Sequence, residues 1–219
     1  MDLGPLIVKI CGLSTAEGLD AALAAGADMV GFVFFAPSPR HLDLGTAREL
    51  GQRVEGRARK VALTVNAEDV ELAGVVAALE PDMLQLHGAE SPERVAAIRA
   101  RFGLPVMKAI GMARRTDLAI LPRYASIADA VLFDAKPSPD ASRPGGNGLS
   151  FDWRILSGVE LDRPWLLSGG LTCENVGEAL AQSGAPGVDV SSGVERAPGI
   201  KDPALIAKFV AAARSRRDL

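Results

Sequence analysis

Cysteine is scarce in this sequence, and the two that occur, Cys11 and Cys173, lie far apart. They lack the close spacing of paired metal ligands, so they predict no metal site, and a single pair does not form a disulfide framework. Such sparse cysteine is typical of a reducing compartment. We therefore expect a cytoplasmic protein.

An excess of positive charge is also missing: 24 Lys and Arg face 27 Asp and Glu, a net charge of -3. A nucleic-acid-binding surface needs a basic stripe, and none is visible. The arginines near the end, Arg214, Arg216 and Arg217, fit a solvated helix C-terminus. No apolar run reaches the roughly 20 residues of a membrane span. Asp2 stands where a signal peptide would be basic. Neither nucleic acid nor a membrane is expected as a partner.

A regular alternation is present instead. Short apolar strands are each followed by a loop with glycine or a polar residue and then by an Ala- and Leu-rich amphipathic helix. The predicted strands are residues 6–10, 29–34, 61–65, 83–86, 106–110, 130–133, 165–167 and 188–190. The predicted helices are residues 15–26, 45–54, 69–79, 92 onward, 116–124, 151–156, 174–182 and 202–215.

Eight strand–helix units without a break in composition predict a parallel sheet. Within 219 residues they match one closed (β/α)8 barrel, a single domain over residues 1–219. The alternative is an open doubly wound sheet. That fold would more often show a glycine-rich fingerprint after its first strand, where Gly12 stands alone.

Candidate functional residues are those at the C-terminal ends of the predicted strands, where such barrels place their active sites. Loops with glycine follow strands seven and eight. Glycine lets backbone N–H groups approach an anion closely, so this pair of loops predicts a phosphate site; two tight turns without a ligand are the alternative. The full set is Cys11, Arg40, Asn66, His87, Asp134, residues 145–148, Gly169, Gly170, Asp189 and residues 191–193.

Asp134 closes an almost purely apolar strand. A carboxylate there is costly unless it is used or paired, so it is a candidate general acid. A structural pairing with Lys136 or Arg143 is the alternative.

Cys11 follows an apolar run, where a cysteine is more often an inert core residue. Lys9 and Cys11 face the same side of a strand because side chains alternate. A nearby ammonium favours the thiolate, which can act as a base.

Two further polar residues allow two interpretations each. His87 is either an acid–base group or, as we favour, a substrate contact or structural donor. Arg40, after Pro-Ser-Pro, is an exposed loop cation or an arginine that binds a carboxylate. His41 fits a surface loop, and Cys173, at a helix start, is expected to be structural.

The chain as a whole resembles the phosphoribosylanthranilate isomerase family of tryptophan biosynthesis, whose members have a single (β/α)8 domain. The resemblance covers nearly all of the chain in the right order. It rests on residues 9–12, 31–34, 38–40, 85–88, 132–134, 145–148 before 151–153, 168–171 with 174–176, and 189–195.

The resemblance implies an Amadori rearrangement of N-(5-phosphoribosyl)anthranilate to 1-(2-carboxyphenylamino)-1-deoxyribulose 5-phosphate, without a metal or organic cofactor. At matching positions Cys11 is implied to be the general base and Asp134 the general acid. The remaining roles follow in the same way: Arg40 holds the anthranilate, Asp189 contacts the substrate near its amine, and the backbones of Gly169, Gly170, Ser192 and Gly193 hold the phosphate.

Two positions depart from the family pattern: Asn147 stands where Thr or Ser is expected, and Cys173 where a helix-starting Pro is usual. Neither affects the implied acid or base. A related histidine-pathway isomerase would carry an aspartate in place of Cys11, and an inactive barrel serving as a binding module would be expected to lack Cys11 or Asp134. The sequence leaves a monomer and a homodimer equally open.

Overall fold

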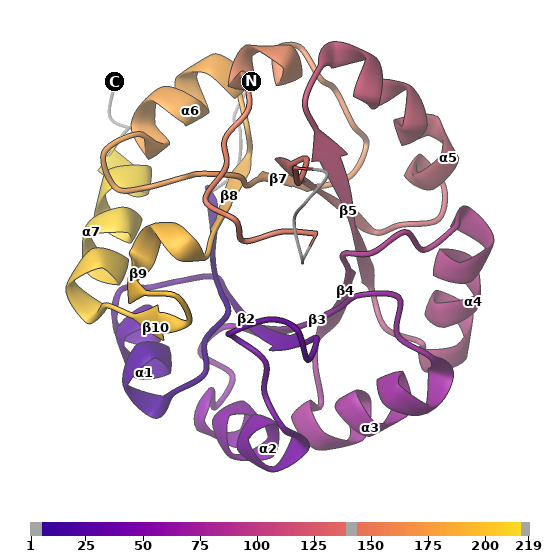
Figure 1. Cartoon of the computed structure of the whole chain (residues 1–219), viewed down its shortest axis with the longest axis vertical. Helices are drawn as coiled ribbons and strands as arrows, with labels where there is room; N and C mark the ends of the chain where they lie inside the picture. Colours follow the sequence, from indigo (N-terminus) through magenta and orange to yellow (C-terminus); the bar gives the residue numbers. More distant parts are fainter. Residues whose placement is uncertain (1–5, 139–143, 216–219) are drawn as a thin grey trace.

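Eight parallel strands close into a barrel in the computed structural model, which describes residues 6–138 and 144–215. Each strand pairs with the next along the chain, and the first pairs with the eighth (Figure 1). The predicted (β/α)8 barrel is confirmed. The strands are β1 (Ile7–Cys11), β2 (Met29–Phe34), β3 (Arg59–Thr64), β4 (Met83–Leu86), β5 (Val106–Met112), β6 (Ala130–Ala135), β7 (Trp165–Leu167) and β8 (Gly187–Val190).

Helices form the outer ring of the barrel (Figure 1). Several begin where a polar side chain accepts a hydrogen bond from a first-turn amide: Thr15 from Gly18, Asp43 from Thr46, and Ser91 from Arg94. The α-helices are α1 (Ala16–Ala24), α2 (Leu44–Arg53), α3 (Asp69–Leu79), α4 (Pro92–Phe102), α5 (Leu121–Ala125), α6 (Val176–Ser183) and α7 (Pro203–Arg214). None of these helices, in the described part of the chain, is long and apolar enough to cross a membrane.

The regular pattern is interrupted at three places. The predicted helix 116–124 is a 3-10 helix, η1 (Arg115–Ile120), followed by the short α5, whose first turn contains Pro122. The predicted helix 151–156 is only a 3-10 turn, η2 (Trp153–Leu156). After β8, a 3-10 turn, η3 (Ser192–Val194), leads into an antiparallel hairpin that the sequence analysis missed. Its strands are β9 (Glu195–Ala197) and β10 (Ile200–Lys201).

Two strand boundaries matter for the chemistry. β1 ends one residue later than predicted, so Cys11 is its last residue. β6 runs on to Ala135, so Asp134 is held by strand geometry and not by a loop. Both side chains are therefore fixed by the barrel itself.

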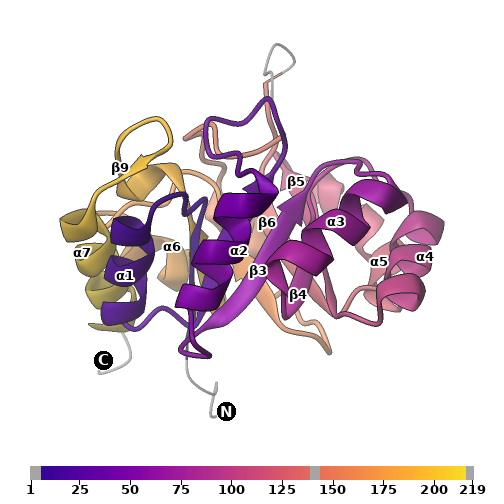
Figure 2. The same cartoon turned by 90° about the horizontal axis from the view of Figure 1, so that it is seen from below.

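The barrel interior is layered. Its lower part is a buried apolar cluster that includes Met29, Met83, Met107 and Leu166. On β1 the alternation holds: Val8 and Ile10 pack in the core shared with the helices, while Lys9 lies fully buried on the other face. The upper interior is thus partly charged. Hairpin β9–β10 and the loop after β2 lie on this side of the barrel (Figure 2).

Candidate active site

A cavity opens at the C-terminal ends of the strands and encloses about 760 Å³ including its mouth. Eight of the nine predicted site residues line it, and Gly193 does not. Asn66 also lies outside the lining; its side-chain oxygen accepts a hydrogen bond from the Ala89 amide and so fixes the loop after β3. The eight lining residues are Cys11, Arg40, His87, Asp134, Gly169, Gly170, Asp189 and Ser192.

Cys11 lies beside a buried ion pair. Nζ of Lys9 is 2.7 Å from Oδ1 of Asp189, and the hydroxyl of Ser168 donates to Oδ2 at 3.3 Å. Burial lowers the pKa of Lys9, but Asp189 and Cys11 outweigh it, so this pKa lies above its ordinary value. Lys9 is therefore held as an ammonium within the barrel.

Burial raises the pKa of the Cys11 thiol, and this effect exceeds the lowering by Lys9. The carboxylate of Asp189 adds to the rise. Lys9 lowers the pKa of Cys11, as predicted. The prediction that the thiolate is favoured is incomplete, because burial and Asp189 raise the same pKa by more. In the structure as it stands, the protonated thiol is favoured.

Asp134 is buried and contacts the imidazole of His87, whose Nε2 lies 3.1 Å from Oδ2. Its Oδ1 accepts from the Ala135 amide at 2.8 Å. Neither expected structural partner is in evidence: Lys136 pairs with Asp117, and Arg143 lies outside the described residues. The carboxyl group is therefore oriented by a histidine that also lines the cavity.

Gln85 supports this histidine from β4, with its amide nitrogen 3.0 Å from Nδ1 of His87. With the amide nitrogen facing the ring, Nδ1 is the acceptor and Nε2 carries the hydrogen that is donated to Asp134. Oε1 of Gln85 is buried and has no hydrogen-bond partner among the described residues. Gln85 occurs in the family-like motif, but the sequence analysis gave it no role.

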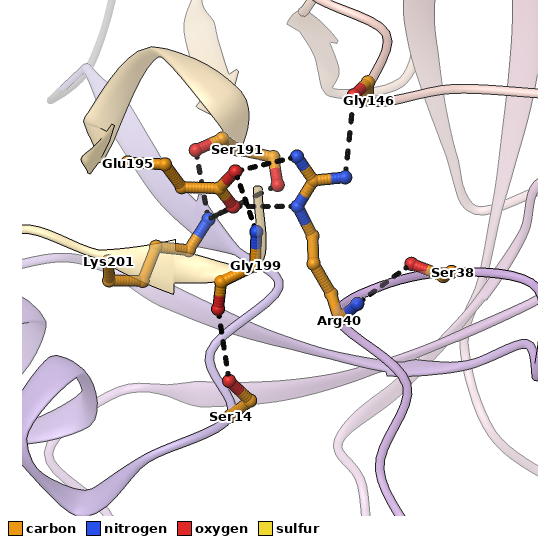
Figure 3. Close-up of polar contacts among 8 residues, drawn as sticks. All are labelled: Ser14, Ser38, Arg40, Gly146, Ser191, Glu195, Gly199 and Lys201. Atoms are coloured by element: carbon orange, nitrogen blue, oxygen red, sulfur yellow. Dashed lines mark hydrogen bonds and ion pairs between the residues drawn. The ribbon is translucent and has the colours of Figure 1, made fainter. Parts of the chain in front are cut away.

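Arg40 is not an exposed loop cation, because only 4% of its surface is accessible. Its Nε and Nη2 donate to the two oxygens of Glu195 at 2.7 and 2.8 Å (Figure 3). Nη1 lies 3.4 Å from the carbonyl oxygen of Gly146, on the cavity side. The guanidinium is thus held from behind by a carboxylate. His41, next to it, is exposed as expected.

Lys201 completes this group. Its Nζ donates to Oε1 of Glu195 at 2.8 Å, to the Ser191 carbonyl at 2.9 Å and to the Ser191 hydroxyl at 3.2 Å (Figure 3). Burial lowers the pKa of Lys201, and the carboxylate of Glu195 opposes that lowering. Burial raises the pKa of Glu195, but Arg40 and Lys201 outweigh it and the net pKa is lowered. Nothing in the local sequence marks Lys201, so the sequence analysis missed it.

The loops after β7 and β8 bring backbone to the other side of the cavity. Gly169 and Gly170 have φ values of +91° and +66°, which other residues rarely adopt. A side chain at Gly169 would also meet the Ala135 amide at 2.7 Å. Asn175 fixes the loop by donating to the Gly170 carbonyl at 2.9 Å. Such glycine-lined loops suit a phosphate group.

Metal chemistry has no obvious ligand set here. Within residues 6–138 and 144–215, no three His, Cys, Asp or Glu side chains gather as a metal site would require. The polar groups that line the cavity include a thiol, a carboxyl group with its histidine, the Arg40 guanidinium and the glycine-bearing loops.

A family model described as N-(5'-phosphoribosyl)anthranilate (PRA) isomerase matches residues 8–212. An N-(5'-phosphoribosyl)anthranilate isomerase of Rhodopseudomonas palustris (strain BisA53) is 60% identical over 215 residues, covering 98% of this chain and 99% of the relative. Another N-(5'-phosphoribosyl)anthranilate isomerase, from Nitrobacter winogradskyi, is 60% identical over 210 residues, covering 96% of this chain and 93% of the relative.

Solved structures agree with these relatives. The phosphoribosylanthranilate isomerase of Thermotoga maritima superposes with a TM-score of 0.85 at 33% identity, covering 96% of this chain and 99% of that one. A phosphoribosylanthranilate isomerase in complex with reduced 1-(o-carboxyphenylamino)-1-deoxyribulose 5-phosphate gives a TM-score of 0.81 at 31% identity, with the same coverage.

Proposed function

The chain belongs to the N-(5'-phosphoribosyl)anthranilate isomerase family, and we propose that Cys11 and Asp134 are the base and acid of its reaction. It is an isomerase of tryptophan biosynthesis that catalyses the Amadori rearrangement of N-(5-phosphoribosyl)anthranilate to 1-(2-carboxyphenylamino)-1-deoxyribulose 5-phosphate. The observation that carries the assignment is that both side chains line one cavity together with Arg40 and the glycine loops.

Asp134 begins the reaction by protonating the furanose ring oxygen. The C1–O bond breaks, the nitrogen lone pair forms a C=N bond, and an open-chain Schiff base results. A general acid must carry the proton that it donates, so Asp134 acts as the carboxylic acid, and its 3.1 Å hydrogen bond with Nε2 of His87 orients it.

Cys11 then removes the proton from C2, and the electrons of that C–H bond move to give an enolamine. The enolamine becomes the product ketone when its hydroxyl loses a proton and C1 gains one. Forming the thiolate is costly in the buried site. The positive charge on the protonated Schiff base lowers that cost, since an opposite charge nearby favours the ionised thiol.

Substrate binding uses the two ends of the cavity. Arg40 binds the anthranilate carboxylate with the guanidinium hydrogens that Glu195 leaves unused. The backbones at Gly169, Gly170, Ser192 and Gly193 hold the phosphate. Asp189 contacts the substrate near its amine, and His87 lies between acid and substrate. A phosphate-sized anion placed away from these loops in a crystal structure would contradict this arrangement.

The direct test is a turnover assay with purified protein. Phosphoribosylanthranilate is fluorescent, and its disappearance reports the rearrangement. We expect turnover well above the uncatalysed background, and its absence would show that this chain does not catalyse the reaction.

We also propose a cytoplasmic, single-domain enzyme over residues 1–219, acting as a monomer or homodimer. The pairing of the first strand with the eighth supports a single domain. The helices of the described residues include no membrane span. A solved relative from Thermotoga maritima is described as dimeric, which supports including the homodimer.

A further inference from the structure

Behind the wall of the cavity lies a buried group of three charges, Arg40, Glu195 and Lys201 (Figure 3). Their side chains are 4%, 4% and 2% exposed, so water screens none of them well. Arg40 comes from the loop after β2, and the other two come from hairpin β9–β10. The hairpin, which the eightfold pattern does not require, thus places two charges beside one cavity residue.

The contact between Arg40 and Glu195 is bidentate, a strong and geometrically specific form of ion pair. It uses the N–H of Nε and one N–H of Nη2. Glu195 leaves unused the two hydrogens of Nη1 and one of Nη2, and one hydrogen from each of these nitrogens forms the adjacent edge of the guanidinium. Nη1 makes a long contact of 3.4 Å to the carbonyl oxygen of Gly146 in the lining loop. This edge is the one offered to a carboxylate in the cavity.

Taken alone, the pair of Arg40 and Glu195 has no net charge. A substrate carboxylate approaching it would meet attraction from the guanidinium and repulsion from Glu195. Lys201 changes this balance, because its ammonium lies 2.8 Å from the same carboxylate. Two cations and one anion leave the group with a net charge of +1.

The position of Lys201 is itself well determined. Its three N–H groups have three acceptors, namely Glu195 and two oxygens of Ser191. Two of these acceptors, a carboxylate and a carbonyl, cannot donate in return, as suits an ammonium. The Gly199 amide donates to Oε2 of Glu195 at 3.1 Å and secures the carboxylate within the hairpin. Ser191 directly precedes Ser192 of the phosphate loop, so Lys201 joins the two anion-binding regions.

We propose that Lys201 is a positioning residue that keeps the Arg40–Glu195 pair cationic, and that it thereby selects substrates whose aromatic amine carries a carboxylate. The proposal rests on the assignment of Arg40 to the substrate carboxylate. Lys201 does not line the cavity, so it acts through Arg40 and Glu195 and not by touching the substrate.

Two ligands separate this role from a general structural one. The first is the reduced 1-(2-carboxyphenylamino)-1-deoxyribulose 5-phosphate bound by a solved relative. The second is the same molecule with a phenylamino group in place of the 2-carboxyphenylamino group, so that only the aromatic carboxylate is missing. Their dissociation constants would be measured by titration calorimetry for the wild type, K201Q and the matched control K208Q, which removes the exposed lysine of α7. Binding, unlike turnover, does not depend on the thiolate of Cys11.

We expect K201Q to raise the dissociation constant of the carboxylated ligand on the order of tenfold, because one buried charge of the group is lost. In K201Q the dissociation constant of the ligand without the carboxylate should change by less than about twofold. K208Q should leave the dissociation constants of both ligands unchanged. Equal weakening of both ligands would assign Lys201 a structural role only. No weakening of either would show that the net charge does not matter. Either result overturns the proposal.

If K201Q does not fold, the double variant E195Q/K201M provides a second test. It replaces a buried ion pair by neutral side chains of similar size, a change that proteins often tolerate. Arg40 then keeps the net charge at +1, so retained preference for the carboxylated ligand supports the proposal and lost preference overturns it. The R40M variant distinguishes the assignment of Arg40 to the substrate carboxylate from the role of Lys201. If R40M keeps the preference, the assignment of Arg40 is wrong; if R40M loses it while K201Q keeps it, only the role of Lys201 is wrong.

Discussion

Nε2 of His87 lies 3.1 Å from Oδ2 of Asp134, so a histidine just after β4 and a carboxyl group on β6 share one hydrogen bond at the cavity. Gln85 contacts the other ring nitrogen at 3.0 Å. The proposed acid, Asp134, is therefore the end of a chain of three side chains and not an isolated carboxyl group. Each member can be tested separately.

Asp134→Asn should abolish proton donation while preserving the shape of the site. We expect kcat to fall by roughly 10³-fold or more, in line with the loss of a principal acid–base group. Binding of the reduced carboxyphenylamino product analogue should persist, because its carboxylate and phosphate contact other residues. Asp152→Asn, at an exposed pair with Arg154, is the matched control and should be neutral. Near-normal kcat in Asp134→Asn would remove Asp134 from the mechanism.

Gln85→Leu tests whether the amide fixes the orientation of His87. The Gln85 nitrogen contacts Nδ1 of the ring at 3.0 Å, and leucine cannot replace that hydrogen bond. We expect kcat to fall about tenfold, because the imidazole that orients Asp134 loses one hydrogen bond.

Gln52→Leu, on the exposed face of α2, is the control for this change. Both proteins should be compared in the fluorescence assay. An unchanged kcat in Gln85→Leu would mean that Gln85 only fills space beneath the histidine.

Local sequence was sufficient for the barrel and for much of its rim. The strand from Met29 to Phe34 and the helix from Asp69 to Leu79 have the predicted bounds, because apolar runs and capping residues act within a few positions. The contact of Arg40 with Glu195 joins residues 155 positions apart, and no local pattern encodes it. Burial of Cys11 likewise depends on the closed barrel. Hence the candidate residues could be found from sequence, but the charges and bonds that tune them could not.

Cys11 should be protonated at neutral pH in the free enzyme. Burial raises its pKa more than Lys9 lowers it, and a thiolate forms only when the proton is lost. The thiolate should therefore appear only at a pH above that at which a free thiol ionises. The measurement is the ultraviolet absorbance of the thiolate in Cys173→Ser protein, with the additional Cys11→Ser variant as the blank. A transition near pH 7 would show that the cations beside Cys11 outweigh its burial.

Gly12→Ala tests whether the residue after Cys11 leaves room for the arginine. Gly12 has a φ of +74°, and a side chain there would collide with Cδ of Arg40. Gly26→Ala is a matched control, because Gly26 has a φ of +81° but no atom within 4 Å of an added side chain. Each variant should lose about 1 kcal/mol of stability to urea, since alanine is strained at positive φ.

Only Gly12→Ala should also displace the guanidinium. We expect its kcat/KM to fall on the order of tenfold, mainly through KM, because a shifted arginine weakens binding more than it changes proton transfer. Gly26→Ala should retain normal kinetics at similar stability. If both variants show the same activity, Arg40 has more freedom than its bidentate bond with Glu195 implies. A loss confined to Gly12→Ala would show that the backbone beside Cys11, the proposed base, also sets the position of Arg40.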